Sequence, residues 1–286
     1  MNGFLVLNKP SGPSSFSAVY RARASLGVTK IGHAGTLDPF AEGLLLIALG
    51  SYTRLIPMFD GMPKEYVAVG ILGETRDTDE ITGEVTATVA IPDIDESRLR
   101  DLIRTSFSGT ITQTPPQYSA RKVGGVRAYK IAREGGTADI KPHTVTIYEH
   151  ELLRFEPPAF TIRVLSSRGT YIRTIVRDIG TALGCGAYTA RLTRTRIGTI
   201  DLSHAVSPDA VTPDAVIPFS ALFPDIPLTP VTDAVLRKQL MNGNRNLISV
   251  VPEGTTYYSE PDGDLIAVTE KSADKIRFVF VSSGER

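Results

Sequence analysis

The sequence contains a single cysteine, Cys185, and no tryptophan. One cysteine cannot form an internal disulfide, so the chain lacks the covalent framework of a small secreted protein, and we expect a cytoplasmic location. The longest run of large apolar residues, at 44–49, is far shorter than the roughly 20 residues that a helix needs to cross a membrane. We therefore expect no membrane span.

Residues that bind metals and nucleotide cofactors are also scarce. None of the four histidines has a second histidine or a cysteine at zinc-ligand spacing; they are His33, His143, His150 and His204. No glycine-rich loop of the dinucleotide-binding or Walker type occurs. We expect neither a metal site nor a cofactor, which leaves carboxylate, tyrosine and arginine side chains for any chemistry.

The formal net charge is +0, but the charges are unevenly distributed along the chain. Residues 118–196 contain 14 Lys and Arg against 6 Asp and Glu, whereas residues 74–101 contain 9 acidic residues and 3 basic ones. A basic stretch of this kind suits a polyanion such as nucleic acid, although a solvated basic surface is equally ordinary.

Short runs rich in β-branched and aromatic residues dominate the chain of 286 residues and predict a sheet framework. Helices are predicted at 15–26, at 96–107 after Asp95 as a possible cap, and at 172–183 before Gly184. Strands are predicted at 3–7, 66–72, 144–155, 160–165, 247–251, 265–268 and 276–281. This pattern indicates a mixed α/β fold of the α+β class.

Prolines mark a boundary near the C-terminus. Six of the 19 prolines lie at 208–230, where helices and strands are hard to continue. We therefore expect a main domain at 1–207, a Pro-rich connection at 208–228 and a small β-rich domain at 229–286.

The segment Gly-His-Ala-Gly-Thr-Leu-Asp-Pro at 32–39 has the composition of a loop. Its glycines permit tight backbone paths, and Pro39 biases Asp38 away from helical geometry. The loop therefore presents Asp38, either as a reactive carboxylate or as an ordinary turn or helix cap. The same ambiguity applies to His33, which more often supports a scaffold than takes part in catalysis.

Two further segments contain several basic side chains, one at a predicted junction of a strand and a helix and the other among glycines. At 166–178 a strand is predicted to end and a helix to begin, and Arg173 and Arg177 share one face of that helix. One of them could pair with a buried carboxylate while the other meets solvent or phosphate. At 115–129, basic and aromatic residues alternate with glycines, which suits either an RNA-binding loop or a basic surface.

In chain order, these segments resemble the TruB-type tRNA pseudouridine synthases. The signature is the Gly-His-Ala-Gly-Thr-Leu-Asp-Pro block at 32–39. The supporting blocks are Lys-Pro-Ser-Gly-Pro-Ser-Ser at 9–15, Lys-Glu-Tyr at 64–66, the Thr/Asp-rich turn at 73–79, the Tyr-Ser-Ala-Arg-Lys segment within 116–133, and Gly-Thr-Tyr-Ile-Arg within 167–173. Chance recurrence of five supporting blocks in the family's order is far less probable than that of any single short match.

The resemblance implies a cofactor-independent isomerase that converts uridine 55 in the T loop of tRNA to pseudouridine. It implies the pseudouridine synthase fold, with a largely antiparallel mixed sheet around a central cleft, followed by a β domain that resembles a PUA domain. It also implies a monomer that binds the T arm of tRNA without an obligate protein partner.

By the same resemblance, Asp38 is the catalytic aspartate, acting as nucleophile or base, and Arg173 is the arginine that pairs with it. Tyr66 corresponds to the catalytic tyrosine that stacks on the target base and helps its proton transfers. Tyr171 and Leu192 correspond to substrate-binding residues that line the uridine pocket, and His33 corresponds to the histidine that supports the RNA after the nucleotide leaves the stack. Candidate phosphate contacts are Lys9, Arg121, Lys122, Arg127 and Lys130.

Three alternative hypotheses belong to other classes. A non-catalytic RNA-binding protein with the same cleft would not need Asp38. A guide-RNA-dependent synthase subunit shares this core, but the chain shows no long basic tails for protein partners. A glycoside enzyme acting on small molecules fits the basic middle of the chain least well. The C-terminal 58 residues, with 7 basic and 8 acidic residues, show no clear phosphate-binding cluster.

Overall fold

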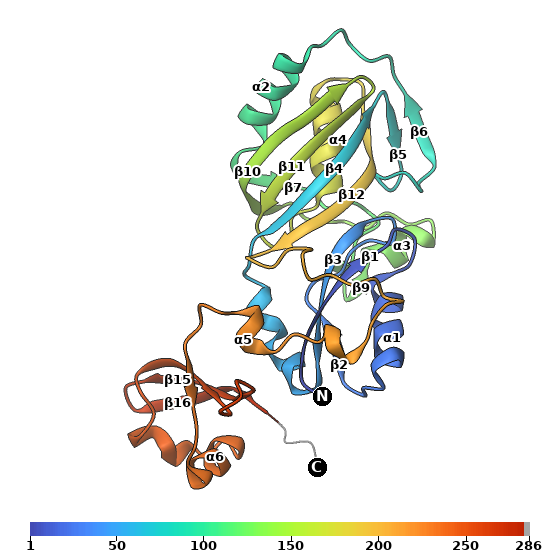
Figure 1. The fold of residues 1–286 in the computed structure, drawn as a ribbon. Coiled ribbons are helices and arrows are strands. Elements are labelled where there is room, and N and C mark those ends of the chain that lie inside the picture. The colour runs from blue at the N-terminus through green and yellow to red at the C-terminus, as the bar shows by residue number, and fades with distance from the viewer. Residues whose placement is uncertain (283–286) are drawn as a thin grey trace.

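The computed structural model describes residues 1–282 and has one large sheet of eight strands (Figure 1). The path through the sheet is β1 (Gly3–Lys9), β3 (Glu42–Leu49), β12 (Ala187–Ile197), β4 (Lys64–Leu72), β11 (Ala159–Ser166), β10 (His143–Glu156) and β7 (Gly109–Gln113), with β2 (Ile31–His33) paired to β3. Strands β3 and β12 pair in parallel, and the other pairs of this sheet are antiparallel. The predicted mixed, largely antiparallel sheet is confirmed.

Strand β3 explains the apolar run noted in the sequence. Leu44 and Leu46 face one hydrophobic cluster, and Leu45 and Ile47 face another on the opposite side. A strand that is buried on both faces has no polar alternation. The strand thus runs through the core and follows the loop that carries Asp38 in the chain.

The three predicted helices are present with nearly the predicted bounds: α1 (Ser15–Leu26), α2 (Glu96–Ser106) and α4 (Ile172–Ala182). The Ser14 side chain accepts the Ser17 backbone N–H, and the Asp95 side chain accepts that of Arg98, so both helix starts are capped. Helix α4 packs on β4 and β12 (Figure 1).

Shorter elements connect this framework. They are η1 (Gly50–Phe59), β5 (Glu74–Arg76), β6 (Val85–Thr88), β8 (Lys122–Val123), β9 (Val126–Arg127), α3 (Ala128–Arg133), η2 (Pro213–Ala215) and α5 (Phe219–Leu222). Across residues 1–282, every helix is too short or too polar to cross a membrane.

The C-terminal region forms its own four-stranded sheet. It contains β13 (Leu228–Pro230), α6 (Ala234–Met241), η3 (Arg245–Ser249), β14 (Gly254–Ser259), β15 (Leu265–Ser272) and β16 (Lys275–Val281). The strand predicted at 247–251 is wrong, because most of this apolar segment forms the 3-10 helix η3. The predicted domain limits, and the likeness of this region to a PUA domain, stay predictions.

This C-terminal sheet packs on η1. The Tyr52 hydroxyl accepts a hydrogen bond from the Leu265 backbone N–H at 3.0 Å, and the Tyr52 and Phe280 rings lie edge to face at 5.7 Å. In Figure 1 the region lies at the opposite end of the molecule from α2.

Candidate active site

Asp38 lies in the loop between β2 and β3, and helix α1 fixes this loop. The Ser15 hydroxyl accepts from the Leu37 backbone N–H at 2.8 Å and lies 2.9 Å from the Leu37 carbonyl, to which it donates. The Gly12 backbone N–H donates to the Pro39 carbonyl at 2.8 Å. The loop predicted to present Asp38 is confirmed, and its backbone is held on both sides of the carboxylate.

Lys9 supports the same loop, and its burial disfavours the expected phosphate contact, which stays a prediction. Its side chain is 0% exposed, and Nζ donates to the carbonyls of Pro10, Pro13 and Pro39 at 2.8, 2.8 and 3.1 Å. All three ammonium protons are therefore used inside the protein. Burial lowers the pKa of Lys9 to about 8.

Arg173, on the first turn of α4, pairs with Asp38. Its Nε lies 3.0 Å from Asp38 Oδ2, and its side chain is 4% exposed whereas that of Asp38 is 41% exposed. The other guanidinium nitrogens donate to the carbonyls of Thr78 at 2.7 Å and Tyr118 at 3.0 Å. The planar guanidinium thus holds three groups at once and orients the accessible carboxylate.

A second ion pair, partly buried, involves Arg177, which lies one turn after Arg173 on α4. Arg177 Nη1 lies 3.0 Å from Asp79 Oδ2, and Arg177 also pairs with Asp178. Burial raises the pKa of Asp79 above its usual range, although the positive charges of Arg177 and Arg173 act in the opposite direction. The sequence predicts that one of Arg173 and Arg177 pairs with a carboxylate while the other meets solvent or phosphate. It does not identify Asp79, which lies 98 positions before Arg177.

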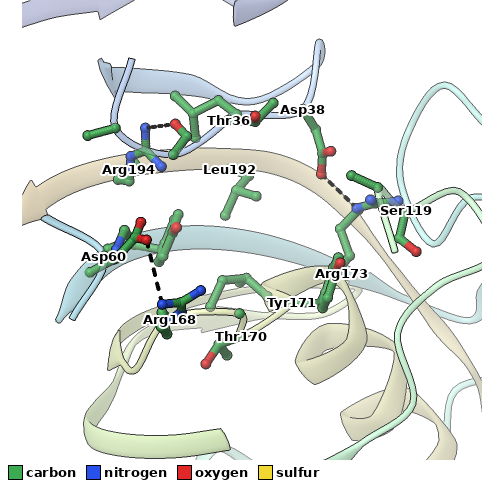
Figure 2. A pocket seen from close by; sticks show the side chains of 18 of the residues that line it. Thr36, Asp38, Asp60, Ser119, Arg168, Thr170, Tyr171, Arg173, Leu192 and Arg194 are labelled. Atoms are coloured by element: carbon green, nitrogen blue, oxygen red, sulfur yellow. Dashed lines mark hydrogen bonds and ion pairs between the residues drawn. The ribbon is translucent and has the colours of Figure 1, made fainter. Parts of the chain in front are cut away.

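A cavity of about 350 Å³ opens beside Asp38 (Figure 2). Its lining includes Asp38, Arg173, Tyr66, Tyr171 and Leu192. These residues come from the β2–β3 loop, α4, β4, the residue preceding α4, and β12. The structure therefore brings together five of the side chains that the resemblance selects, and their roles in the reaction stay predictions.

The pocket is tied to the segment at 115–129, in which basic and aromatic residues alternate with glycines. Ser119 is 4% exposed and lines the cavity next to Tyr171. Burial raises the pKa of the half-buried Tyr171. The Gln113 side chain accepts from the Tyr171 N–H at 3.1 Å, which fixes the backbone there.

Comparisons with known proteins show the family to which this chain belongs. The N-terminal domain of the TruB family of pseudouridylate synthases matches residues 23–172, and the tRNA pseudouridylate synthase B C-terminal domain matches residues 173–217. The chain belongs to the TruB family.

Two relatives named tRNA pseudouridine synthase B illustrate the range of similarity. The protein from Thermosipho melanesiensis is 36% identical over 281 residues, which cover 94% of this chain and 91% of the relative. The protein from Syntrophotalea carbinolica is 44% identical over 210 residues, which cover 73% of this chain and 68% of the relative.

Among solved structures, this TruB-family fold is similar to chains in two larger assemblies. A chain in an H/ACA RNP bound to a substrate RNA containing 2′-deoxyuridine has a TM-score of 0.66 at 22% identity, covering 98% of this chain and 84% of that one. A chain in a Cbf5-Nop10-Gar1 complex has the same TM-score at 23% identity, covering 99% and 84%. At these identities the likeness shows the pseudouridine synthase fold.

His33 lies on β2, beside the pocket of this TruB-family protein but outside its lining. The side chain is half-buried, and its pKa is lowered first by burial and then by the positive charge of Arg194. The imidazole is therefore favoured in its neutral form. Its expected contact with the flipped nucleotide stays a prediction.

The remaining candidate phosphate contacts lie together on one small substructure. Arg121, Lys122, Arg127 and Lys130 are all exposed, on the β8–β9 hairpin or next to it. Their exposure is compatible with RNA binding, which stays a prediction. Among residues 1–282, no cluster of three or more His, Cys, Asp or Glu side chains has the arrangement of a metal site.

Proposed function

We propose that this TruB-family enzyme converts uridine 55 in the T loop of tRNA to pseudouridine, as a monomer, in the cytoplasm and without an obligate protein partner. The observation that carries the proposal is the Asp38–Arg173 pair at 3.0 Å in the wall of a pocket that Tyr66, Tyr171 and Leu192 also line. The relatives named tRNA pseudouridine synthase B support tRNA as the substrate.

One carboxylate is enough for this isomerisation. A glycosidase uses a second carboxyl group to activate water or protonate the leaving group. Here the detached uracil stays bound, turns and bonds to the sugar through C5, so the pocket must position two fragments and keep water out. Asp38 either attacks C1′ or removes the proton from C2′, and both routes need an ionised carboxylate that is held in place.

The target uridine must leave the base stack before C1′ reaches Asp38. Extrusion of a nucleotide costs about a few kcal/mol, which stacking and phosphate contacts offset. The half-buried rings of Tyr66 and Tyr171 provide stacking surfaces for the base. The exposed cations Arg121 and Lys122 lie where the segment after Ser119 leaves the pocket, and they are proposed to contact the RNA backbone.

The test is tritium release from an unmodified tRNA transcript that carries [5-³H]uridine, followed by mapping of the modified position. We expect release and a single pseudouridine at position 55. A transcript with cytidine at position 55 is the matched control, and it should yield no pseudouridine. Release from that control, or modification at another position, would contradict the proposed site.

A further inference from the structure

Two cations in the pocket make no ion pair with any residue that the structure describes. Lys64, at the start of β4, and Arg194, on β12, both line the cavity. Among residues 1–282, no carboxylate lies within ion-pair distance of either side chain. The two lining carboxylates, Asp38 and Asp60, are instead paired with Arg173 and Arg168. The pocket therefore carries an excess of positive charge.

The two cations flank one glycine of the Asp38 loop. A Cβ built on Gly35 would lie 3.4 Å from Arg194 Nη1 and 3.6 Å from Lys64 Cε. Arg194 is 1% exposed, and its Nε and Nη2 donate to the carbonyls of Leu44 and Gly35. Its Nη1 has no hydrogen-bond acceptor within the described part of the chain and remains available to the cavity.

Lys64 is held in a similar way. Its Nζ donates to the carbonyls of Phe59 at 3.3 Å and Met62 at 3.2 Å, which leaves one of its three N–H donors. Burial lowers the pKa of Lys64, and the positive charge of Arg194 lowers it further. Two neighbouring cations that lack a carboxylate favour a ligand with negative charge or strong acceptor oxygens.

The position of this cationic end relative to Asp38 indicates which part of the substrate it meets. Figure 2 shows Asp38 and Arg173 on one side of Leu192 and Arg194 on the other. With C1′ of the target uridine at Asp38, a base lying over Leu192 extends toward Arg194. The carbonyl oxygens of the base then approach the Arg194 and Lys64 donors.

We propose that Lys64 and Arg194 bind the O2 or O4 carbonyl of the target uracil and stabilise the negative charge on the base after it detaches. This inference rests on the proposed function. It makes Lys64 and Arg194 catalytic residues, and it explains how the base can leave without a second carboxylic acid to protonate it.

The electrons balance in this step. When the N1–C1′ bond breaks, its electron pair stays on uracil and is shared among N1, O2 and O4. C1′ either accepts a pair from an Asp38 oxygen or forms a double bond to C2′ as Asp38 takes the C2′ proton. C5 then bonds to C1′ with the pair from the uracil anion. In the first route the C1′–Asp38 bond breaks and its pair returns to the carboxylate, and in the second Asp38 returns the proton to C2′ as the double bond opens. The C5 proton is then released. Fixed donors at such a charge typically contribute about 100-fold or more to the rate.

The test compares two leaving groups in the same variant. Single-turnover consumption of the N1-linked nucleoside is measured on tRNA with uridine or 5-fluorouridine at position 55. Fluorine withdraws electrons and stabilises the uracil anion without help from the protein. We expect K64M to slow the uridine substrate about 100-fold, to slow the fluorinated substrate by a distinctly smaller factor, and K64R to recover most of the loss.

The comparison within one variant separates chemistry from folding and binding. A poorly folded protein, or a Lys64 that binds a phosphate, would slow both substrates by the same factor, and that result would overturn the inference. K122M, which changes an exposed lysine outside the pocket, is the control and should leave the ratio of the two rates unchanged. Failure of the wild-type protein to consume uridine 55 would instead contradict the proposed function.

Discussion

Arg173 Nε contacts Asp38 Oδ2 at 3.0 Å while the two terminal nitrogens of Arg173 are occupied by the Thr78 and Tyr118 carbonyls. The orientation of the carboxylate therefore depends on two distant segments, the Thr/Asp-rich turn at 73–79 and the basic and aromatic segment at 115–129. Lysine has the same charge but cannot make this planar set of three contacts.

Arg173→Lys is expected to lower the single-turnover rate of tRNA modification by about 100-fold, because a carboxylate displaced by about 1 Å loses that much positioning. Binding of tRNA, measured by filter retention, should change little. Arg191→Lys is the matched control, since Arg191 is exposed and pairs with Glu42 outside the pocket. An Arg173→Lys enzyme with the wild-type rate would show that charge alone is sufficient.

Lys9 and Lys122 are predicted to have different roles: Lys9 stabilises the fold, and Lys122 contributes to tRNA affinity. Lys9→Met should lower the free energy of unfolding by about 1–3 kcal/mol, because buried carbonyls lose their donor. It should leave the salt dependence of tRNA affinity unchanged. Lys122→Met should reduce the slope of log affinity against log salt by about 1 with little effect on stability. A reduced slope for Lys9→Met would instead support Lys9 as a phosphate contact.

The pKa of Lys9 also predicts a pH dependence. It is lowered by burial from 10.5 to about 8 in the folded protein, so between these values the unfolded chain binds more protons. Stability therefore rises with pH through this window. Urea unfolding at pH 8 and pH 10 should show the wild type gaining about 2 kcal/mol relative to Lys9→Met. Parallel pH profiles for the two proteins would contradict this assignment.

Much of the fold could be predicted from local patterns. Helices α1 and α2 follow capping side chains at Ser14 and Asp95, which act within one turn. The apolar segment at 247–251 was predicted as a strand, because a short apolar run does not distinguish a strand from a helical turn. There the Asn244 side chain accepts the Asn246 N–H and starts η3 instead.

Strand β12 was not predicted, although it lies at the centre of the sheet and carries Leu192. Its alternating Thr and Arg residues look like a polar surface segment. In the structure, Arg191 and Arg196 pair with Glu42 and Glu65 from strands β3 and β4. Such pairs depend on tertiary structure and leave no local signal.

The candidate site also combines residues that local motifs predict with residues that only the tertiary structure brings together. Asp38, Arg173 and the pocket tyrosines were found through motifs. The Asp79–Arg177 pair and the uncompensated cations Lys64 and Arg194 were not, because each depends on residues far apart in the chain.

Tyr66→Phe keeps the aromatic surface but removes the hydroxyl. If the phenol helps to remove the C5 proton, tritium release should fall about 100-fold or more, the range usual for a positioned acid or base. Affinity for tRNA should be unchanged, because stacking needs only the ring. Equal release by the variant and the wild type would limit Tyr66 to stacking.

The most direct test of the account is tritium release from [5-³H]uridine-labelled tRNA by Asp38→Asn, with Asp60→Asn as the control. Asp60 is the other carboxylate that lines the cavity, and it pairs with Arg168 at 3.6 Å. We expect Asp60→Asn to release tritium and Asp38→Asn to bind the tRNA without release above an enzyme-free reaction. Release by Asp38→Asn at the wild-type rate would contradict the central claim that this carboxylate carries out the chemistry.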